Sequence, residues 1–215
     1  MNKLFIGTTL LLALNACNSK GDKHTAHNGH DTAQHMDHAT TNETSEMKAL
    51  MDGMMTRMHQ QKPTGNNDID YANMMLQHHQ AAIDMANLQL SKGKNDSLKN
   101  FSRQVIAAQQ KEIAFMAEFI SRSNTARSNN AAEFKTAMDA SMQSMMNAAT
   151  PAYNDIDKDF VAQMIPHHQS AVDMAKAYLK YGTNEGLVKM SNDIISSQSE
   201  EINWLKKRWV MRYER

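Results

Sequence analysis

The sequence is poor in several residue types, and each shortage argues against a class of protein. Its single cysteine, Cys17, rules out an internal disulfide bond. Lysine plus arginine and aspartate plus glutamate both number 23, and such a balance argues against a nucleic-acid partner. The apolar run at 4–14 is shorter than the about 20 residues that a membrane-spanning helix needs. No alternating apolar run is long enough to predict a sheet.

Methionine is the residue in marked excess. The chain contains 19 methionines, whereas aromatic residues make up only 6% of it. Thioether side chains can pack an adaptable core in place of leucine and phenylalanine. They are also the ligands that select Cu(I) and, through the same softness, Ag(I). The count alone does not choose between a structural and a metal-binding use, so the positions of these residues must decide.

The N-terminal segment 1–16 has the layout of a secretory signal. Lys3 provides a positive charge, 4–14 are apolar, and a small residue precedes Cys17. A cysteine directly after such a cleavage point resembles the lipobox of bacterial lipoproteins. The resemblance implies a lipid on Cys17 that anchors the chain in a membrane of the cell envelope, facing the periplasm or the outside. An ordinary cleaved signal is the alternative.

Segment 17–42 is polar and shows no aliphatic periodicity. It cannot bury enough apolar surface to offset the entropy of ordering, so we expect a disordered tether. The tether is rich in histidine, at His24, His27, His30, His35 and His38. Such a tract can gather metal ions loosely, or it can be a solubilising linker that happens to contain histidine.

Beyond the tether the sequence is duplicated. The segment 70–86 matches 159–175 at a constant offset of 89, and the same offset aligns 106–113 with 195–202. Upstream, the methionine pattern at 51–58 resembles 138–146 more loosely. We therefore expect one helical domain over 43–213, built from repeats at about 43–121 and 131–213.

Apolar residues recur at three and four positions in each repeat, and turn residues separate the periodic segments. The predicted helices cover 43–60, 68–90, 96–121, 131–147, 155–181 and 185–211. This pattern predicts an all-α, ferritin-like antiparallel four-helix bundle formed by two duplicated hairpins, with two additional short Met-rich helices. Two separate three-helix domains are the alternative.

Each repeat carries a pair of adjacent histidines with methionines around it. At about 100° per residue these side chains lie on or beside the face that points to the core. They form the predicted metal site: Met75, His78, His79 and Met85 in the first copy, and Met164, His167, His168 and Met174 in the second. In the structural interpretation the histidines belong to a self-satisfied polar network. In the functional one they and the methionines converge on a metal ion.

The following helix of each repeat places polar groups within an apolar stripe. These are Gln109 and Glu112 in the first repeat and Gln198 and Glu201 in the second. A buried carboxylate must be paired or coordinated. We therefore expect these four residues to contact the histidine pairs or to act as further ligands.

Pro166 immediately precedes the second histidine pair, whereas Gln77 stands at that position in the first. A proline inside a helix frees a backbone carbonyl, here that of Ala162, and bends the helix. The helix could instead begin near Ile165, with the proline in its first turn.

The string Met164-Ile-Pro-His-His168, followed by Ala171 and Met174-Ala175 and repeated more weakly at 75–86, resembles a bacterial domain family of long-unassigned function. This family is ferritin-like in fold and includes the CopM-type periplasmic copper-binding proteins. The resemblance covers about 68–211 and implies a helical bundle that binds Cu(I) through Met and His. The matching positions are the eight metal-site residues named above, and Leu76-Gln77 departs from the Ile-Pro of the pattern.

Other functions stay open. A di-iron oxidase needs Glu-x-x-His motifs, which this sequence lacks. A scaffold or partner-binding lipoprotein would use the histidines structurally, and no protein partner can be named. A reserve metal site is predicted at the first Met-rich helix, with Met51, Met54, Met55, Met58 and His59 spaced at three and four.

Overall fold

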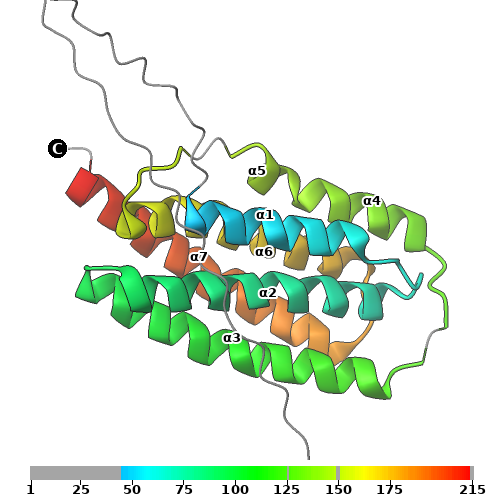
Figure 1. Cartoon of the computed structure of the whole chain (residues 1–215). Coiled ribbons are helices and arrows are strands. Elements are labelled where there is room, and N and C mark those ends of the chain that lie inside the picture. Colours follow the sequence, from blue (N-terminus) through cyan, green and yellow to red (C-terminus); the bar gives the residue numbers. More distant parts are fainter. Residues whose placement is uncertain (1–44, 125, 149–150, 214–215) are drawn as a thin grey trace, which may run out of the picture. The chain divides into compact units, whose positions relative to one another are not determined.

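A computed structural model describes residues 45–124, 126–148 and 151–213, and every regular element in these ranges is helical (Figure 1). The helices are α1 (Glu46–Gln60), α2 (Asn67–Lys92), α3 (Asp96–Arg122), α4 (Ala131–Ser141), α5 (Gln143–Met146), α6 (Ile156–Tyr181) and α7 (Glu185–Tyr213). The predicted signal, Cys17 and the His-rich tether lie outside the described residues. Within those residues, none of the helices has the length and apolarity needed to cross a membrane.

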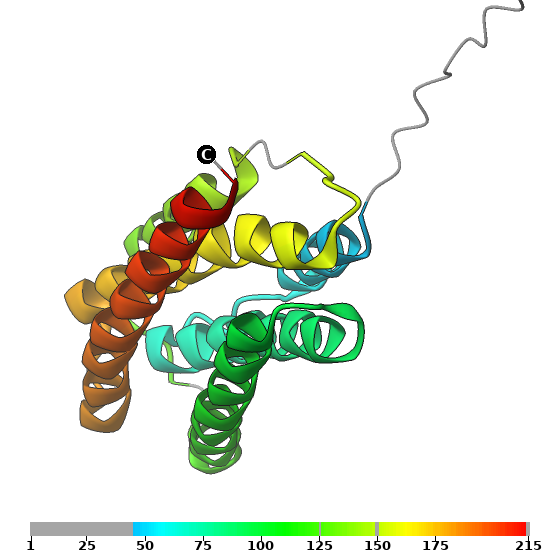
Figure 2. The same cartoon turned by 90° about the vertical axis from the view of Figure 1, so that its left-hand side faces the viewer.

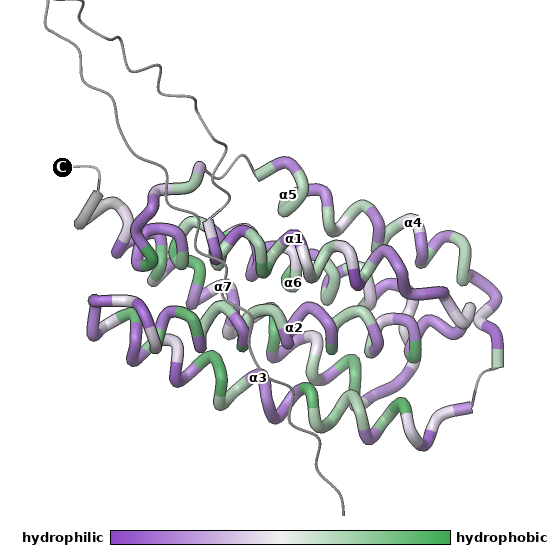
Figure 3. Tube along the Cα trace, viewed as in Figure 1, coloured by the Kyte–Doolittle hydropathy of each residue, from purple (hydrophilic) through white to green (hydrophobic). Residues whose placement is uncertain are grey.

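The two long hairpins, α2–α3 and α6–α7, form the predicted antiparallel four-helix bundle, and α2 packs against α6 (Figure 2). Small side chains allow two helices to pack closely, and α2 and α6 contain the fully buried Ala82 and Ala171. Polar and apolar segments alternate along the helices (Figure 3), as expected when each helix buries one face.

Each repeat also provides an aspartate that accepts hydrogen bonds from the interhelical turn of the other repeat. The Asp157 carboxylate accepts hydrogen bonds from the backbone N–H of Lys94 (3.0 Å) and Asn95 (3.2 Å), which lie in the turn of the other hairpin. Its repeat equivalent, Asp68, accepts from the Thr183 N–H (2.9 Å) and from the Tyr178 hydroxyl (2.6 Å). This exchange joins the two hairpins within the helical bundle.

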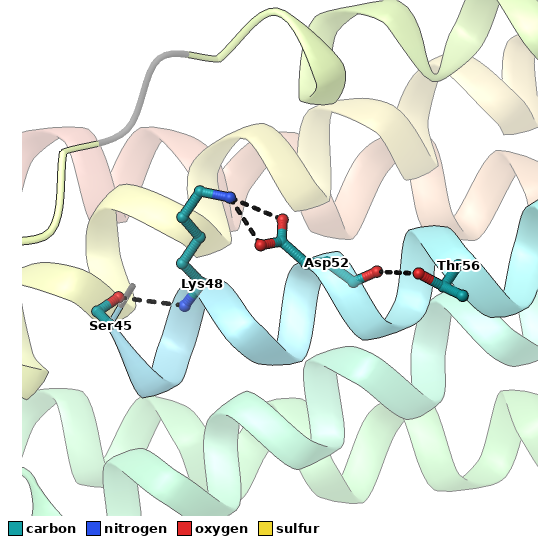
Figure 4. Close-up of polar contacts among 4 residues, drawn as sticks. All are labelled: Ser45, Lys48, Asp52 and Thr56. Carbon is teal, nitrogen blue, oxygen red and sulfur yellow. Dashed lines mark hydrogen bonds and ion pairs between the residues drawn. The ribbon is translucent and has the colours of Figure 1, made fainter. Parts of the chain in front are cut away.

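The two Met-rich segments cover the side of the bundle formed by α2 and α6. Helix α1 buries Met47, Met51, Met54 and Met58 and turns its polar face outward. On that outer face Lys48 pairs with Asp52 at 2.7 Å, while the Ser45 hydroxyl caps the helix by accepting from the Lys48 N–H (Figure 4).

The second Met-rich segment is two helices, whereas the sequence predicted one over 131–147. The break falls at Met142, whose N–H donates to the Asp139 carbonyl three residues back at 3.3 Å. The Ser141 hydroxyl also donates to the Met138 carbonyl at 2.6 Å. Such local bonds compete with the regular helical pattern and interrupt it.

Candidate metal centre

Four histidines occupy the middle of the bundle, two on α2 and two on α6. His78, His79, His167 and His168 are all fully buried. The four methionines predicted beside them, Met75, Met85, Met164 and Met174, are buried to the same extent. Helix α6 runs continuously through Pro166, so this proline lies inside the helix next to the second histidine pair.

The rings of His78 and His167 meet where α2 crosses α6, with their centroids 3.7 Å apart. The His167 Nε2 lies 3.1 Å from the His78 carbonyl oxygen. A carbonyl oxygen can only accept, so His167 carries its proton on Nε2.

Ser170 fixes the proton of the other ring. Its hydroxyl donates to the His167 carbonyl at 2.8 Å, and its oxygen lies 2.7 Å from the His78 Nε2. The carbonyl at 2.8 Å is a closer and stronger acceptor for the serine proton than the Met145 sulfur at 3.7 Å, and with the proton there the His78 Nε2 donates to the serine oxygen. Both central rings therefore carry their proton on Nε2.

The environment also keeps these two rings neutral. Burial lowers the pKa of His78 and of His167 well below the ordinary value, and the neighbouring histidines lower it further. In a neutral ring protonated on Nε2, the Nδ1 atom has a free lone pair. Both Nδ1 atoms are buried without a hydrogen-bond partner in the described residues.

The outer histidine of each pair faces a carboxylate on the following helix. His79 Nε2 lies 2.7 Å from Glu112 Oε2, and His168 Nε2 lies 2.9 Å from Glu201 Oε2. These contacts are short, but neither Nε2 makes a directed hydrogen bond. These contacts are electrostatic and hold the rings in place. The glutamate side chains are 22% and 24% exposed, so each carboxylate reaches from the core toward solvent.

Further polar atoms around the centre lack partners within the described residues. They are the Nδ1 atoms of His79 and His168 and the side-chain carbonyl oxygens of Gln109 and Gln198. An unsatisfied buried polar group costs about 1–3 kcal/mol. The structure thus brings all four predicted histidines into the buried middle of the bundle, where their four Nδ1 atoms lack hydrogen-bond partners among the described residues.

This donor set suits a soft ion better than a hard one. Among the described residues, no three side chains of His, Cys, Asp or Glu converge closely enough to hold a metal ion. The buried donors on α2 and α6 are imidazole nitrogen and thioether sulfur, a combination that fits Cu(I) or Ag(I).

The sequence alone did not single out Ser170 or Met145. Ser170 replaces the Ala81 of the first repeat, and its hydroxyl oxygen lies 3.7 Å from the Met145 sulfur as well as beside His78. The sequence did contain a signal for Ser170, because the two repeats differ at this position, two residues after the repeated histidine pair. No sequence signal placed Met145 there, because this contact joins α5 to the bundle.

The predicted reserve site is divided in the structure. Met51 and Met54 lie on the buried face of α1, and Met55 is partly buried against the core. Met58 and the exposed His59 instead line a separate pocket at the end of α1. Whether any of these residues is a ligand stays a prediction.

Comparison with known proteins places this arrangement in a family. Residues 68–209 match the model described as a domain of unknown function (DUF305). The chain is 32% identical to the structure "CopM in the Ag-bound form (by soaking)", covering 68% of this chain and 96% of that one with a TM-score of 0.52.

Two further CopM structures resemble the chain to the same degree. "CopM in the Cu(I)-bound form" is 31% identical, covers 68% of this chain and 97% of that one, and has a TM-score of 0.51. "CopM in the Cu(II)-bound form" is 34% identical, covers 68% and 98%, and has a TM-score of 0.51. No curated protein matches the chain.

Proposed function

The chain belongs to the DUF305 family, and we propose that it binds a soft monovalent ion, Cu(I) or Ag(I), in copper sequestration, tolerance or transfer. The observation that supports this proposal most directly is the set of buried, partnerless Nδ1 atoms in the middle of the bundle. Structures of CopM, a relative of this chain, contain bound Cu(I) and Ag.

The proposed ligands are the imidazoles of His78, His79, His167 and His168 with nearby thioethers. Because no three of these imidazoles converge in the described structure, each ion would be held by one or two of them together with sulfur. Met75, Met85, Met164 and Met174 provide the sulfur donors closest in sequence to these rings. A neutral imidazole binds a metal through its unprotonated nitrogen, and thioether sulfur discriminates in favour of Cu(I). The enclosed core would also exclude water from the bound ion.

Glu112 and Glu201 are proposed to orient the outer histidines. A carboxylate beside a ligating histidine fixes the ring and raises its basicity. Gln109 and Gln198 lie one helical turn before these glutamates and are proposed as further outer groups or ligands.

A structural role for the same residues is the alternative. The contacts of His79 with Glu112 and of His168 with Glu201 would also fix the register of the helices without any metal. Replacing methionine sulfur without changing side-chain volume distinguishes metal binding from a structural role, because only metal binding requires the sulfur.

Met75→Leu combined with Met164→Leu is expected to weaken Cu(I) binding at least tenfold. Exchanging methionine for leucine nearly conserves volume and costs less than about 1.5 kcal/mol at each position, whereas a sulfur ligand is lost completely. Affinity is measured by anaerobic competition with a chromophoric Cu(I) chelator, and stability by urea unfolding of the metal-free protein.

The matched control is Met116→Leu, a fully buried methionine on α3 outside the proposed ligand set. This variant should bind Cu(I) as tightly as the wild type. If the Met75/Met164 variant also binds as tightly, these two methionines are core residues, and the proposed ligand set fails.

We further propose that Cys17 carries a lipid that anchors the protein in the cell envelope. The lipobox-like segment before Cys17 supports this proposal. Cys17→Ser should shift the protein from the membrane fraction to the soluble or unprocessed pool, as followed by fractionation and immunoblotting. Unchanged processing and membrane association in this variant would contradict it.

A further inference from the structure

A second group of methionines surrounds an open pocket beside the bundle. The pocket has a volume of about 560 Å³ and lies between the end of α1, the first turns of α2, and α4–α5. Its soft donors are Met58, His59, Met74, Met138, Met142 and Met146.

We propose that this thioether pocket is a second binding site for a soft monovalent metal ion, Cu(I) or Ag(I), separate from the buried histidines. Five methionines and one histidine supply sulfur and imidazole donors from three parts of the chain. Thioether and imidazole are the ligand types that select Cu(I) over the harder divalent ions.

Three of these methionines, Met58, Met138 and Met142, belong to the hydrophobic core, and all five border open space. A methionine used to fill an irregular core closes a gap, whereas these side chains border a space far larger than the about 30 Å³ share of one water molecule. In the described lining, the only other large apolar side chains are those of Phe134 and Pro63. Leucine, isoleucine and valine, the usual residues of an apolar pocket, do not line it.

Both carboxylates that line the pocket already have partners. The Asp139 carboxylate pairs with Lys135 at 2.6 Å. The Asp70 carboxylate accepts from the Thr64 and Gly65 N–H groups at 2.7 and 3.0 Å. A cation that enters therefore meets sulfur, imidazole and the unpartnered Gln61 amide oxygen, with no free carboxylate among the described lining residues, which favours a soft ion over Ca²⁺ or Mg²⁺.

The pocket combines a fixed wall with an accessible one. Met58 and Met138 are only 5% and 1% exposed and are held by packing, whereas Met146 is 54% exposed and His59 also faces solvent. Met138, Met142 and Met146 follow at intervals of four, so they share one side of the α4–α5 segment. An ion from solvent can thus reach this site, in contrast to the fully buried histidines.

The same segment also connects the pocket with the buried centre. Met142 lines the pocket, and Met145, three residues later, places its sulfur 3.7 Å from the Ser170 oxygen beside His78. An ion held by Met142 would therefore lie on the segment that reaches the histidines.

The test is a titration of the full chain with Ag(I), a redox-stable probe, followed by NMR of ¹³C-methyl-labelled methionine and by mass spectrometry. The methyl signals of Met58, Met138, Met142 and Met146 are expected to shift with saturation. Met138→Leu/Met142→Leu/Met146→Leu should lose one bound Ag(I) and abolish the shift at Met58. These changes nearly conserve volume, and a circular dichroism melt confirms folding.

The matched control is Met47→Leu/Met116→Leu, two buried methionines outside the pocket and outside every predicted ligand set. This control should retain the pocket ion, and equal loss in both variants would overturn the proposal. A pocket variant that keeps every bound Ag(I), with pocket methyl signals that stay unshifted in the wild type, would overturn it as well.

A His78→Gln/His167→Gln background separates this proposal from the proposed function. The pocket shifts should persist there. If binding at the histidines is absent while the pocket shifts remain, the proposed function fails and the pocket stands. If the histidine changes also remove the pocket shifts, there is one coupled site, and a separate pocket site is excluded.

Discussion

His78→Gln combined with His167→Gln is expected to weaken Cu(I) binding by more than about 100-fold. Losing an outer-shell partner of a metal ligand typically costs about 10–100-fold, and losing the ligands themselves should exceed that range. These two rings lie at the crossing of α2 and α6 with centroids 3.7 Å apart, so the double change removes both central Nδ1 donors at once. Affinity is measured by anaerobic competition with a Cu(I) chelator.

The matched control for this prediction is His35→Gln/His38→Gln, which changes two histidines of the N-terminal polar segment outside both proposed Cu(I) sites. It should leave the tightest site unaffected. Undiminished Cu(I) affinity in a folded His78/His167 variant would assign these rings to a structural network.

The metal-free protein is expected to lose stability on acidification below about pH 6.5. The folded state holds His78 and His167 neutral, because burial lowers their pKa, whereas the unfolded chain binds protons at these residues near the ordinary histidine value of about 6.5. Acidification therefore favours the unfolded state. Between pH 7.5 and 5.5 each group should cost about 1.4 kcal/mol, or about 3 kcal/mol together.

This loss is measured by urea unfolding of the metal-free protein across that pH range. Of the titratable groups nearby, His79 and His168 act on these rings electrostatically, and Glu112 and Glu201 contact His79 and His168. The His78→Gln/His167→Gln variant retains all four of these groups and should show a flatter profile. A variant with the same pH dependence as the wild type would show that other groups control it.

Most of the helical architecture could be predicted from local patterns. The 89-residue offset and the three-and-four spacing predicted both hairpins, and the observed α2, α3, α6 and α7 agree with the predicted ranges to within about two residues at each end. The prediction of one helix over 131–147 was wrong. Bonds at Ser141 and Met142 interrupt that segment, and periodicity does not report such local competition.

The position of the histidines was predictable for the same reason. Helical periodicity alone puts His79 and His168 on the core-facing side and predicts Glu112 and Glu201 on the facing helices. Periodicity says nothing about distances between helices. The 3.7 Å approach of the His78 and His167 rings and the protonation fixed by Ser170 depend on how α2 crosses α6.

The sequence by itself therefore determined the duplication, the helical bundle and the choice of soft donors, because these follow from residue type and from spacing along one helix. Only the tertiary structure decided which imidazole nitrogens lack partners and that Met58 and Met138, on different helices, border one pocket. Both features arise from contacts between residues far apart in the chain. Such contacts are set by the packing of whole helices, which no local pattern encodes.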